Sequence, residues 1–334
     1  MFWDNNTGNG MWETATNWST GSLPGQSDTV VADVFSDALT LSSTQQTGRV
    51  YIDNTFNMNA GSALRIDSGA VLQVNGIYNF NGGALNLSNA GDGNASAEIN
   101  GVMNWTGSAR ILGDLIVTGG PQFLVNTGGT LNFSGSGQNF IFENIGIQNS
   151  GRVLAASTGS STIQLNQASK YVNDGITEFQ GDTLFSTLDT GFIDNASLGK
   201  FINTSGASKV SVTFNNTGTL NVDGGSLTFN KALVNTTGVV NIDGGTLVLS
   251  EAGTPSDNGI YNLTAGTLQI SSNRNFPGGG LKFTGGTFRI DSGAVVNLNP
   301  ATGSLSSFKN LVLDGGATLS GTDAININGD FDWV

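Results

Sequence analysis

Recurring aspartates are the residues of this chain that could do chemistry. Asp223 and Asp243 lie 20 residues apart, and each is followed by two glycines. Stacked coils of a repeat would bring two such carboxylates to about 5 Å from each other, the separation that retaining glycosidases use. Asp67, Asp291 and Asp314 occupy similar positions. Catalysis by a carboxylate pair is therefore one hypothesis for this chain.

The same aspartates also fit a structural role. Asp before Gly favours a tight turn, because its side chain accepts a hydrogen bond from the backbone two residues further on. A catalytic pair would be a local exception to a repeat, whereas these residues follow it. Arg65 and Arg289, which a lyase could use beside calcium, share one Arg-Ile-Asp-Ser-Gly context, which the repeat explains equally well. We therefore predict no catalytic residue and no enzyme.

Composition excludes several kinds of site and partner. The chain has no His and no Cys, which rules out Ser-His-Asp and Cys-His catalysis and imidazole or thiolate metal sites. The turn Asp92-Gly93-Asn94 offers too few oxygens for calcium, so no metal and no cofactor is predicted. The net charge is −13 and the 12 basic residues are scattered, which disfavours nucleic acid and anionic membranes as partners. No run of 18 apolar residues occurs, so no membrane insertion is expected.

The elements that would position these residues are short and repeated. Charged residues make up only 11% of the 334 residues, while Gly reaches 49 and Phe 19. A glycine is repeatedly followed by two apolar residues with a polar one between them, which is the alternation of a half-buried strand. These hexads include Thr217–Val222, Gly224–Phe229, Thr237–Ile242, Gly244–Leu249, Ala265–Ile270 and Gly285–Ile290, and earlier Gly61–Ile66, Gly69–Val74, Gly82–Leu87 and Gly128–Phe133.

The spacing of these six-residue segments predicts that the chain forms repeated coils. Two hexads begin seven residues apart, the pair recurs after 20, and a third apolar segment such as 232–234 lies between pairs. Three short strands per coil of about 20–24 residues predict an all-β fold, a parallel β-helix. A series of asparagines supports this period, since their separations are 23, 24, 22, 21, 19 and 23 residues: Asn126, Asn149, Asn173, Asn195, Asn216, Asn235 and Asn258. We expect them to stack along the axis, although turn propensity alone is an alternative explanation.

The ends of the chain differ from the repeat. Residues 1–36 are predicted to be an N-terminal cap, in which Trp3, Trp12 and Trp18 cover the first coil; a sugar-stacking platform is the alternative. Residues 37–334 are predicted to form the solenoid, less regular at 169–199 and cut from a longer protein at the C-terminus.

Two segments resemble known bacterial surface proteins. Residues 245–270 resemble the β-strand repeat of autotransporter passenger domains. Trp3-Asp4, Trp12, Asn17-Trp18-Ser19, Gly21, Pro24-Gly25 and Asp28-Thr29-Val30 resemble the opening of modules in very large bacterial surface proteins. The resemblance implies export, a right-handed parallel β-helix, and roles in adhesion or biofilm.

These observations lead to three functional hypotheses. The first is a structural or adhesive module of a secreted or cell-surface bacterial protein, outside the cell, with surface glycans or neighbouring modules of the same protein as partners. The second is a carbohydrate-active solenoid, a polysaccharide lyase or hydrolase. The third is glycan binding without catalysis, through Trp or Tyr side chains.

Overall fold

The structure is a computed structural model and describes residues 1–32, 39–66, 69–87, 95–113, 122–251, 258–277, 281–299, 305–322 and 324–334. These residues form an all-β solenoid of about 12 turns, with 56% of residues in strands and 1% in helix. The predicted all-β class and parallel solenoid are confirmed. The chain divides into two compact units. We call residues 1–175 with 187–191 the N-terminal unit, and residues 176–186 with 192–334 the C-terminal unit.

The N-terminal unit has three parallel sheets, and each coil contributes one strand to each sheet. Its first sheet contains β1 (Val30–Ala32), β4 (Val50–Ile52), β7 (Val71–Val74), β10 (Ser96–Ile99), β13 (Phe123–Val125), β16 (Gly146–Asn149) and β19 (Lys170–Asn173). Its second contains β2 (Leu39–Leu41), β5 (Thr55–Met58), β8 (Ile77–Phe80), β11 (Val102–Trp105), β14 (Thr130–Phe133) and β17 (Arg152–Ala155). Its third contains β3 (Thr44–Thr47), β6 (Ala63–Ile66), β9 (Gly83–Asn86), β12 (Ala109–Leu112), β15 (Asn139–Glu143) and β18 (Ser161–Asn166).

The C-terminal unit has the same three sheets and two further short ones. Its first sheet contains β22 (Phe192–Asn195), β25 (Thr213–Asn216) and β28 (Leu233–Asn235). Its second contains β20 (Ile176–Gln180), β23 (Lys200–Ser205), β26 (Thr219–Val222), β29 (Val239–Ile242), β31 (Ile260–Leu263) and β34 (Leu281–Phe283). Its third contains β21 (Thr183–Ser186), β24 (Ala207–Val210), β27 (Ser226–Phe229), β30 (Thr246–Leu249), β32 (Thr267–Ile270), β35 (Thr287–Ile290), β38 (Asn310–Leu313) and β41 (Phe331–Trp333). The further sheets contain β33 (Arg274–Pro277), β36 (Val295–Asn299) and β39 (Thr318–Gly321), and β37 (Leu305–Phe308) and β40 (Ala324–Ile327).

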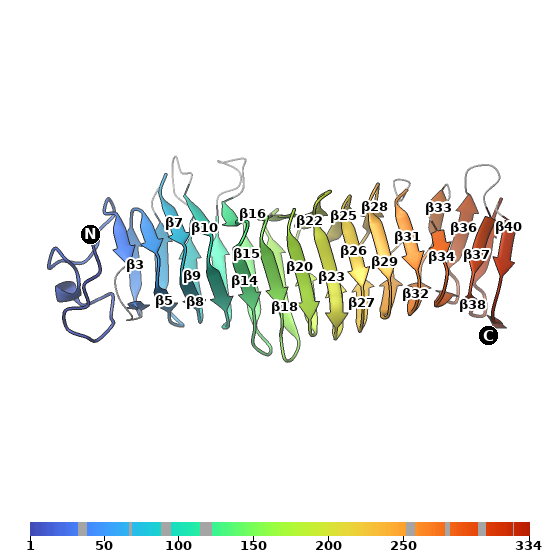
Figure 1. Ribbon diagram of the computed structural model, residues 1–334, viewed down its shortest axis with the longest axis horizontal. Coiled ribbons are helices and arrows are strands. Elements are labelled where there is room, and N and C mark those ends of the chain that lie inside the picture. The colour runs from blue at the N-terminus through green and yellow to red at the C-terminus, as the bar shows by residue number, and fades with distance from the viewer. Residues whose placement is uncertain are drawn as a thin grey trace. The chain divides into compact units, whose positions relative to one another are not determined.

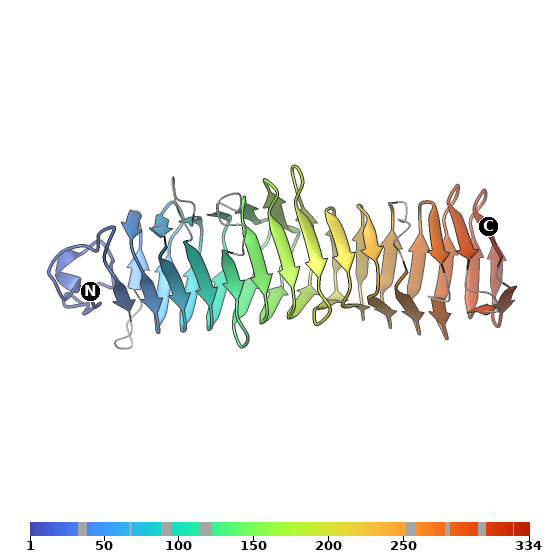
Figure 2. The ribbon, with the colours of Figure 1, turned by 90° about the horizontal axis from the view of Figure 1, so that it is seen from above.

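The register of the strands builds the core. Within each unit the strands of a sheet lie side by side (Figure 1), and their arrows run the same way when the molecule is seen from above (Figure 2). Leu227 of β27 lies opposite Leu247 of β30, which lies opposite Leu268 of β32. All three side chains are fully buried, so each coil covers the apolar residues of the coil before it. A single coil could not bury these residues, which is why the stack is the stable unit.

The N-terminal segment closes the first coil. Phe2 and Met11 form parallel bridges to Val31 of β1 and Thr40 of β2, so the edges of both strands gain backbone partners. The three tryptophans of this segment are at most 2% exposed, and the ring of Trp18 packs 5.1 Å from that of Trp3 and 4.8 Å from that of Trp12. A short 3-10 helix, η1 (Ala15–Asn17), precedes Trp18. The tryptophans therefore form a core over the first coil.

Coils continue through the predicted irregular region, residues 169–199. Strands β19 to β22 lie in this range. The loop 187–191 packs in the N-terminal unit, where Asp189 accepts a hydrogen bond of 2.7 Å from the backbone N–H of Gln167. Gln167 and Ala168 have positive φ angles of 53° and 61° in the turn that Asp189 holds. A side-chain clasp thus stabilises a turn that non-glycine residues rarely adopt.

Candidate functional site

The pair Asp223 and Asp243 lies on exposed turns between the second and third sheets of the C-terminal unit. Asp243 accepts a hydrogen bond of 2.5 Å from the hydroxyl of Thr264, the corresponding residue of the next coil. Partial burial raises the pKa of Asp223, and the neighbouring charges of Asp243 and Glu178 raise it further. The turns therefore bring like charges together on the surface, where water screens them. A general acid that an apolar pocket keeps protonated is buried more deeply than Asp223, whose side chain is exposed.

A second group of charges surrounds Arg289. Its Nε donates to Asp291 at 3.1 Å and its Nη2 donates to Asp314 at 2.6 Å. Asp291 also accepts hydrogen bonds from the hydroxyl of Ser271 and from Gln269, at 2.8 Å in the latter case. Although desolvation acts in the opposite direction, these donors together hold the pKa of Asp291 below its ordinary value.

This group links three consecutive coils. Ser271, Asp291 and Asp314 each follow a strand of the third sheet, namely β32, β35 and β38. Arg289 bonds both Asp291 and Oδ2 of Asp314, so the arrangement works as a clasp between coils, although Oδ1 of Asp314 is buried without a hydrogen-bond partner among the described residues. The matching group around Arg65 cannot be compared, because Asp67 lies outside the described residues.

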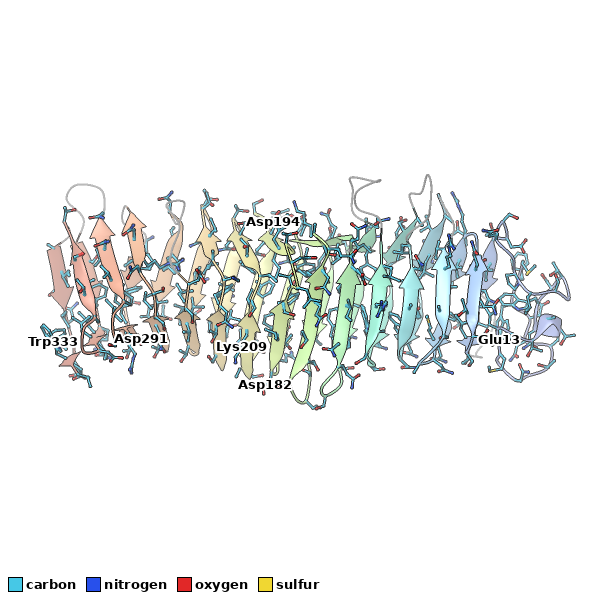
Figure 3. The ribbon with its side chains drawn as sticks, turned by 180° about the vertical axis from the view of Figure 1, so that it is seen from behind. Glu13, Asp182, Asp194, Lys209, Asp291 and Trp333 are labelled. Atoms are coloured by element: carbon cyan, nitrogen blue, oxygen red, sulfur yellow. The ribbon has the colours of Figure 1, made fainter. Side chains whose placement is uncertain are left out.

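Three further charged side chains of the C-terminal unit, all within the described residues, lie at two different edges of it. Figure 3 shows Asp194 at the opposite edge of this unit from Asp182 and Lys209. Asp182 accepts from the backbone N–H of Ala207, and Asp194 accepts from Asn215 of the next coil. Among the described residues no group of three or more acidic side chains could hold a metal ion, and Asp92-Gly93-Asn94 lies outside them. No helix in the described part of the chain is long and apolar enough to cross a membrane.

Five members of the predicted asparagine series are buried, and the structure gives three hydrogen bonds between side chains of neighbouring coils. Asn149 donates to Asn173 at 2.7 Å in the N-terminal unit. In the C-terminal unit Asn195 donates to Asn216 at 2.7 Å, and Asn216 donates to Asn235 at 2.9 Å. These five side chains are buried, at most 1% exposed. The expected stacking along the axis is therefore real for the middle of the series.

Asn126 and Asn258 depart from that prediction. Asn149 lies opposite Val125 in the sheet, so Asn126 is displaced by one residue and its side chain faces the other way. It donates instead to Asn100 at 2.8 Å. Asn258 is exposed and lies two residues before the first residue of β31, Ile260. The buried Asn216 lies three residues before the first residue of β26, Thr219, so the two asparagines do not occupy the same position in their coils. A constant sequence period could not reveal these shifts.

Glycines accompany the buried asparagines for a steric reason. A Cβ atom on Gly238 would lie 2.3 Å from Nδ2 of Asn216 in the preceding coil. A Cβ on Gly259 would lie at the same distance from Nδ2 of Asn235. The repeated association of Asn and Gly in the sequence therefore reflects close approach between coils.

A second set of asparagines, on the outer face of the second sheet, was not predicted. In the N-terminal unit each side chain after the first donates, at 2.7–2.9 Å, to the asparagine one coil earlier in this series: Asn57, Asn79, Asn104 and Asn132. In the C-terminal unit Asn221, Asn241 and Asn262 form the same arrangement. The signal was present in the sequence, as the polar residue between the two apolar residues of a hexad.

Burial decides between the two interpretations of the N-terminal tryptophans. At 2% exposure or less, Trp3, Trp12 and Trp18 cannot stack on a sugar. Tyr78, Tyr171 and Tyr261 are buried too. Trp333, at 74% exposure, is the large aromatic side chain of the described residues that faces solvent most openly.

Comparisons of this chain with protein-family models, with curated proteins and with solved structures give no match.

Proposed function

We propose that this chain is a structural or adhesive module of a large bacterial protein that is secreted or held at the cell surface. One observation carries the proposal: Asp243, Asp291 and Asp314 are each held by hydrogen bonds to residues of neighbouring coils. For these three aspartates, contacts that follow the repeat account for side chains that could otherwise take part in catalysis. What remains is a scaffold with regular outer faces that can space or display binding surfaces.

The location outside the cell rests on the residues that resemble autotransporter repeats and the opening of large surface modules. The composition agrees with this, because Asn, Ser and Thr rather than charged residues cover the faces of the sheets. Surface glycans and neighbouring modules of the same protein are the proposed partners. Antibodies against the folded chain should label intact cells of the source organism, and labelling only after permeabilisation would contradict this location.

The competing hypothesis is a polysaccharide lyase or hydrolase that uses Asp223 and Asp243. The raised pKa of Asp223 is the observation in its favour, since a general acid must hold its proton. A panel of acidic and neutral polysaccharides should give no turnover with the native chain beyond that of an Asp223→Asn/Asp243→Asn variant. Turnover that this double variant lacks would establish the enzyme and overturn the scaffold.

Glycan binding without catalysis is tested separately. An array of bacterial and host glycans, probed with the native chain and with a Trp333→Ala variant, distinguishes specific recognition by this exposed ring from binding elsewhere. Binding that survives the substitution would place the glycan on another surface. Binding that disappears would assign it to Trp333.

A further inference from the structure

Six asparagines of the chain are followed directly by glycine, and five of these pairs lie before the last coil. An asparagine in this context can react with its own backbone, because glycine has no side chain to hinder the approach of its nitrogen to the asparagine side chain. The reaction needs a glycine N–H that is free to lose its proton, and it is helped by a donor on the side-chain oxygen of the asparagine. The structure distinguishes the five pairs by these two requirements.

In four of the five pairs the glycine N–H already donates a hydrogen bond. Three of these glycines donate to a backbone carbonyl of the preceding coil, at 2.6–2.9 Å: Gly76, Gly101 and Gly259. Gly10, in the N-terminal segment, donates to Oδ1 of Asn5 at 3.0 Å. A nitrogen that is held in such a bond must leave its acceptor before it can attack the neighbouring side chain.

The fifth pair, Asn81-Gly82, lies in the turn between β8 and β9. The N–H of Gly82 donates to no group in the part of the chain that the structure describes. Oδ1 of Asn81 accepts a hydrogen bond of 2.9 Å from the hydroxyl of Thr106 in the next coil. A donor at this oxygen stabilises the negative charge that develops there when a nucleophile attacks Cγ. Both requirements are therefore met at Asn81.

We propose that Asn81 is a self-modification site, at which the chain deamidates with help from the hydroxyl of Thr106. The backbone nitrogen of Gly82 loses its proton and forms a bond to Cγ of Asn81, while Thr106 donates to the oxygen that becomes negative. The bond between Cγ and Nδ2 then breaks, Nδ2 takes up a proton and leaves as ammonia, and a cyclic imide remains. Water opens this ring at either of its carbonyls, which gives aspartate or isoaspartate at position 81.

The surroundings of Asn81 allow this reaction and give it a consequence. Asn81 and Thr106 are exposed, so water can reach the imide. Either product replaces a neutral amide with a carboxylate. The isoaspartate form also lengthens the backbone between β8 and β9, where Gly107 of the next coil lies so close to the carbonyl oxygen of Asn81 that a Cβ atom would overlap it. This product should therefore loosen the contact between the two coils.

Peptide mapping by mass spectrometry tests the site in the whole folded chain, incubated at neutral and mildly alkaline pH. The change from amide to carboxylate is followed at each pair, and electron-transfer fragmentation separates aspartate from isoaspartate. Asn81 should react faster as the pH rises, because Gly82 must lose its proton. Asn75, Asn100 and Asn258, whose glycines are hydrogen-bonded, should react at least about tenfold more slowly, since their coils must first open. In guanidinium chloride the four rates should become similar, because the fold then no longer distinguishes the pairs.

Two substitutions at Thr106 test the role of its hydroxyl. Thr106→Val should slow the reaction of Asn81 by at least about threefold, which is less than the 100-fold or more that an oxyanion donor of a closed active site contributes, because this site is open to water. Thr106→Ser keeps the hydroxyl and should restore the native rate. The side chain is exposed, so both variants should keep the native circular dichroism spectrum, and the comparison between pairs in the native chain needs no variant. An unmodified Asn81, equal rates at the hydrogen-bonded pairs of the folded chain, or an unchanged rate in Thr106→Val would each overturn the inference.

Discussion

The first coil and the last coil of the structure differ in what covers their strand edges and their apolar side chains. Both carry tryptophan, but Trp18 is 1% exposed and Trp333 is 74% exposed. At the N-terminal end, backbone bridges to β1 and β2 come together with an aromatic core. At the C-terminal end the strands of the last coil have a partner on one side only. The cover of the first coil thus combines a backbone partner for the strand edges with apolar side chains over the inner face.

The largest expected effect is at the closed end. Trp18→Ala removes a buried indole that packs on Trp3 and Trp12 and donates to the carbonyl of Trp12 at 2.8 Å. We expect a loss of about 3–5 kcal/mol in the free energy of unfolding, measured by urea denaturation. Trp333→Ala is the matched substitution at the open end and should change this free energy by less than about 0.5 kcal/mol. Similar losses in the two variants would remove the distinction between the ends.

A substitution in a coil that has a neighbouring coil on both sides should lower the free energy of unfolding by an amount between these two. Asn216 accepts from Asn195 and donates to Asn235, so Asn216→Ala removes two buried hydrogen bonds, including the one that Oδ1 of Asn235 accepts. The expected loss is about 1–3 kcal/mol by the same denaturation measurement. Asn241→Ala, on the outer face of the second sheet, is the control and should cost under about 1 kcal/mol because water can replace the lost bond. If the outer variant lost as much, burial would not be the reason the inner asparagines matter.

The ion pairs of Arg289 with Asp291 and Asp314 should contribute less to the free energy of unfolding. Arg289→Gln breaks contacts to Asp291 and Asp314, and the arginine side chain is 44% exposed, so screening limits the loss to under about 1 kcal/mol at neutral pH. Folding lowers the pKa of Asp291, so its ionised form stabilises the folded state. This contribution to the free energy of unfolding is fully present above the ordinary Asp pKa of about 3.9. It is lost as the pH falls through the lower pKa of the folded state. Thermal melts between pH 7 and pH 2 should show the native chain and the variant converging in acid. A difference that grows in acid would contradict the clasp.

The smallest effect is expected at the exposed turn of Asp223. Its folded-state pKa is raised, so its charged form opposes folding at neutral pH and this opposition disappears as the pH falls through the raised value. Asp223→Asn should therefore leave stability unchanged or raise it by up to about 0.5 kcal/mol at pH 7, since the side chain is exposed and its charge is screened. The gain should vanish below about pH 4. A clear loss of stability would show that the carboxylate has a structural partner, measured again by thermal melts.

Much of the fold could be predicted from the sequence, because strand alternation and glycine spacing are local signals. Hexads such as Thr237–Ile242 became strands with the expected inward residues. Burial of Trp12 follows the same logic of apolar residues beside a repeat. The handedness of the coil remains a prediction.

What the sequence could not show depends on register between coils. Asn126 and Asn149 look equivalent in the sequence, yet one residue of displacement places them on opposite faces. The clasp around Arg289 joins residues 25 apart, and its importance follows only once β35 and β38 are aligned. The exposure of Phe331 and Trp333 likewise depends on which coil has a neighbour, which no local pattern encodes.

Hydrogen–deuterium exchange tests the difference between the two ends most directly. For this chain of 334 residues we expect slow exchange in β1 and β2, which the N-terminal segment covers, and exchange in β39, β40 and β41 that is faster by orders of magnitude. Equal protection at both ends, or rapid exchange in β1 and β2, would contradict it.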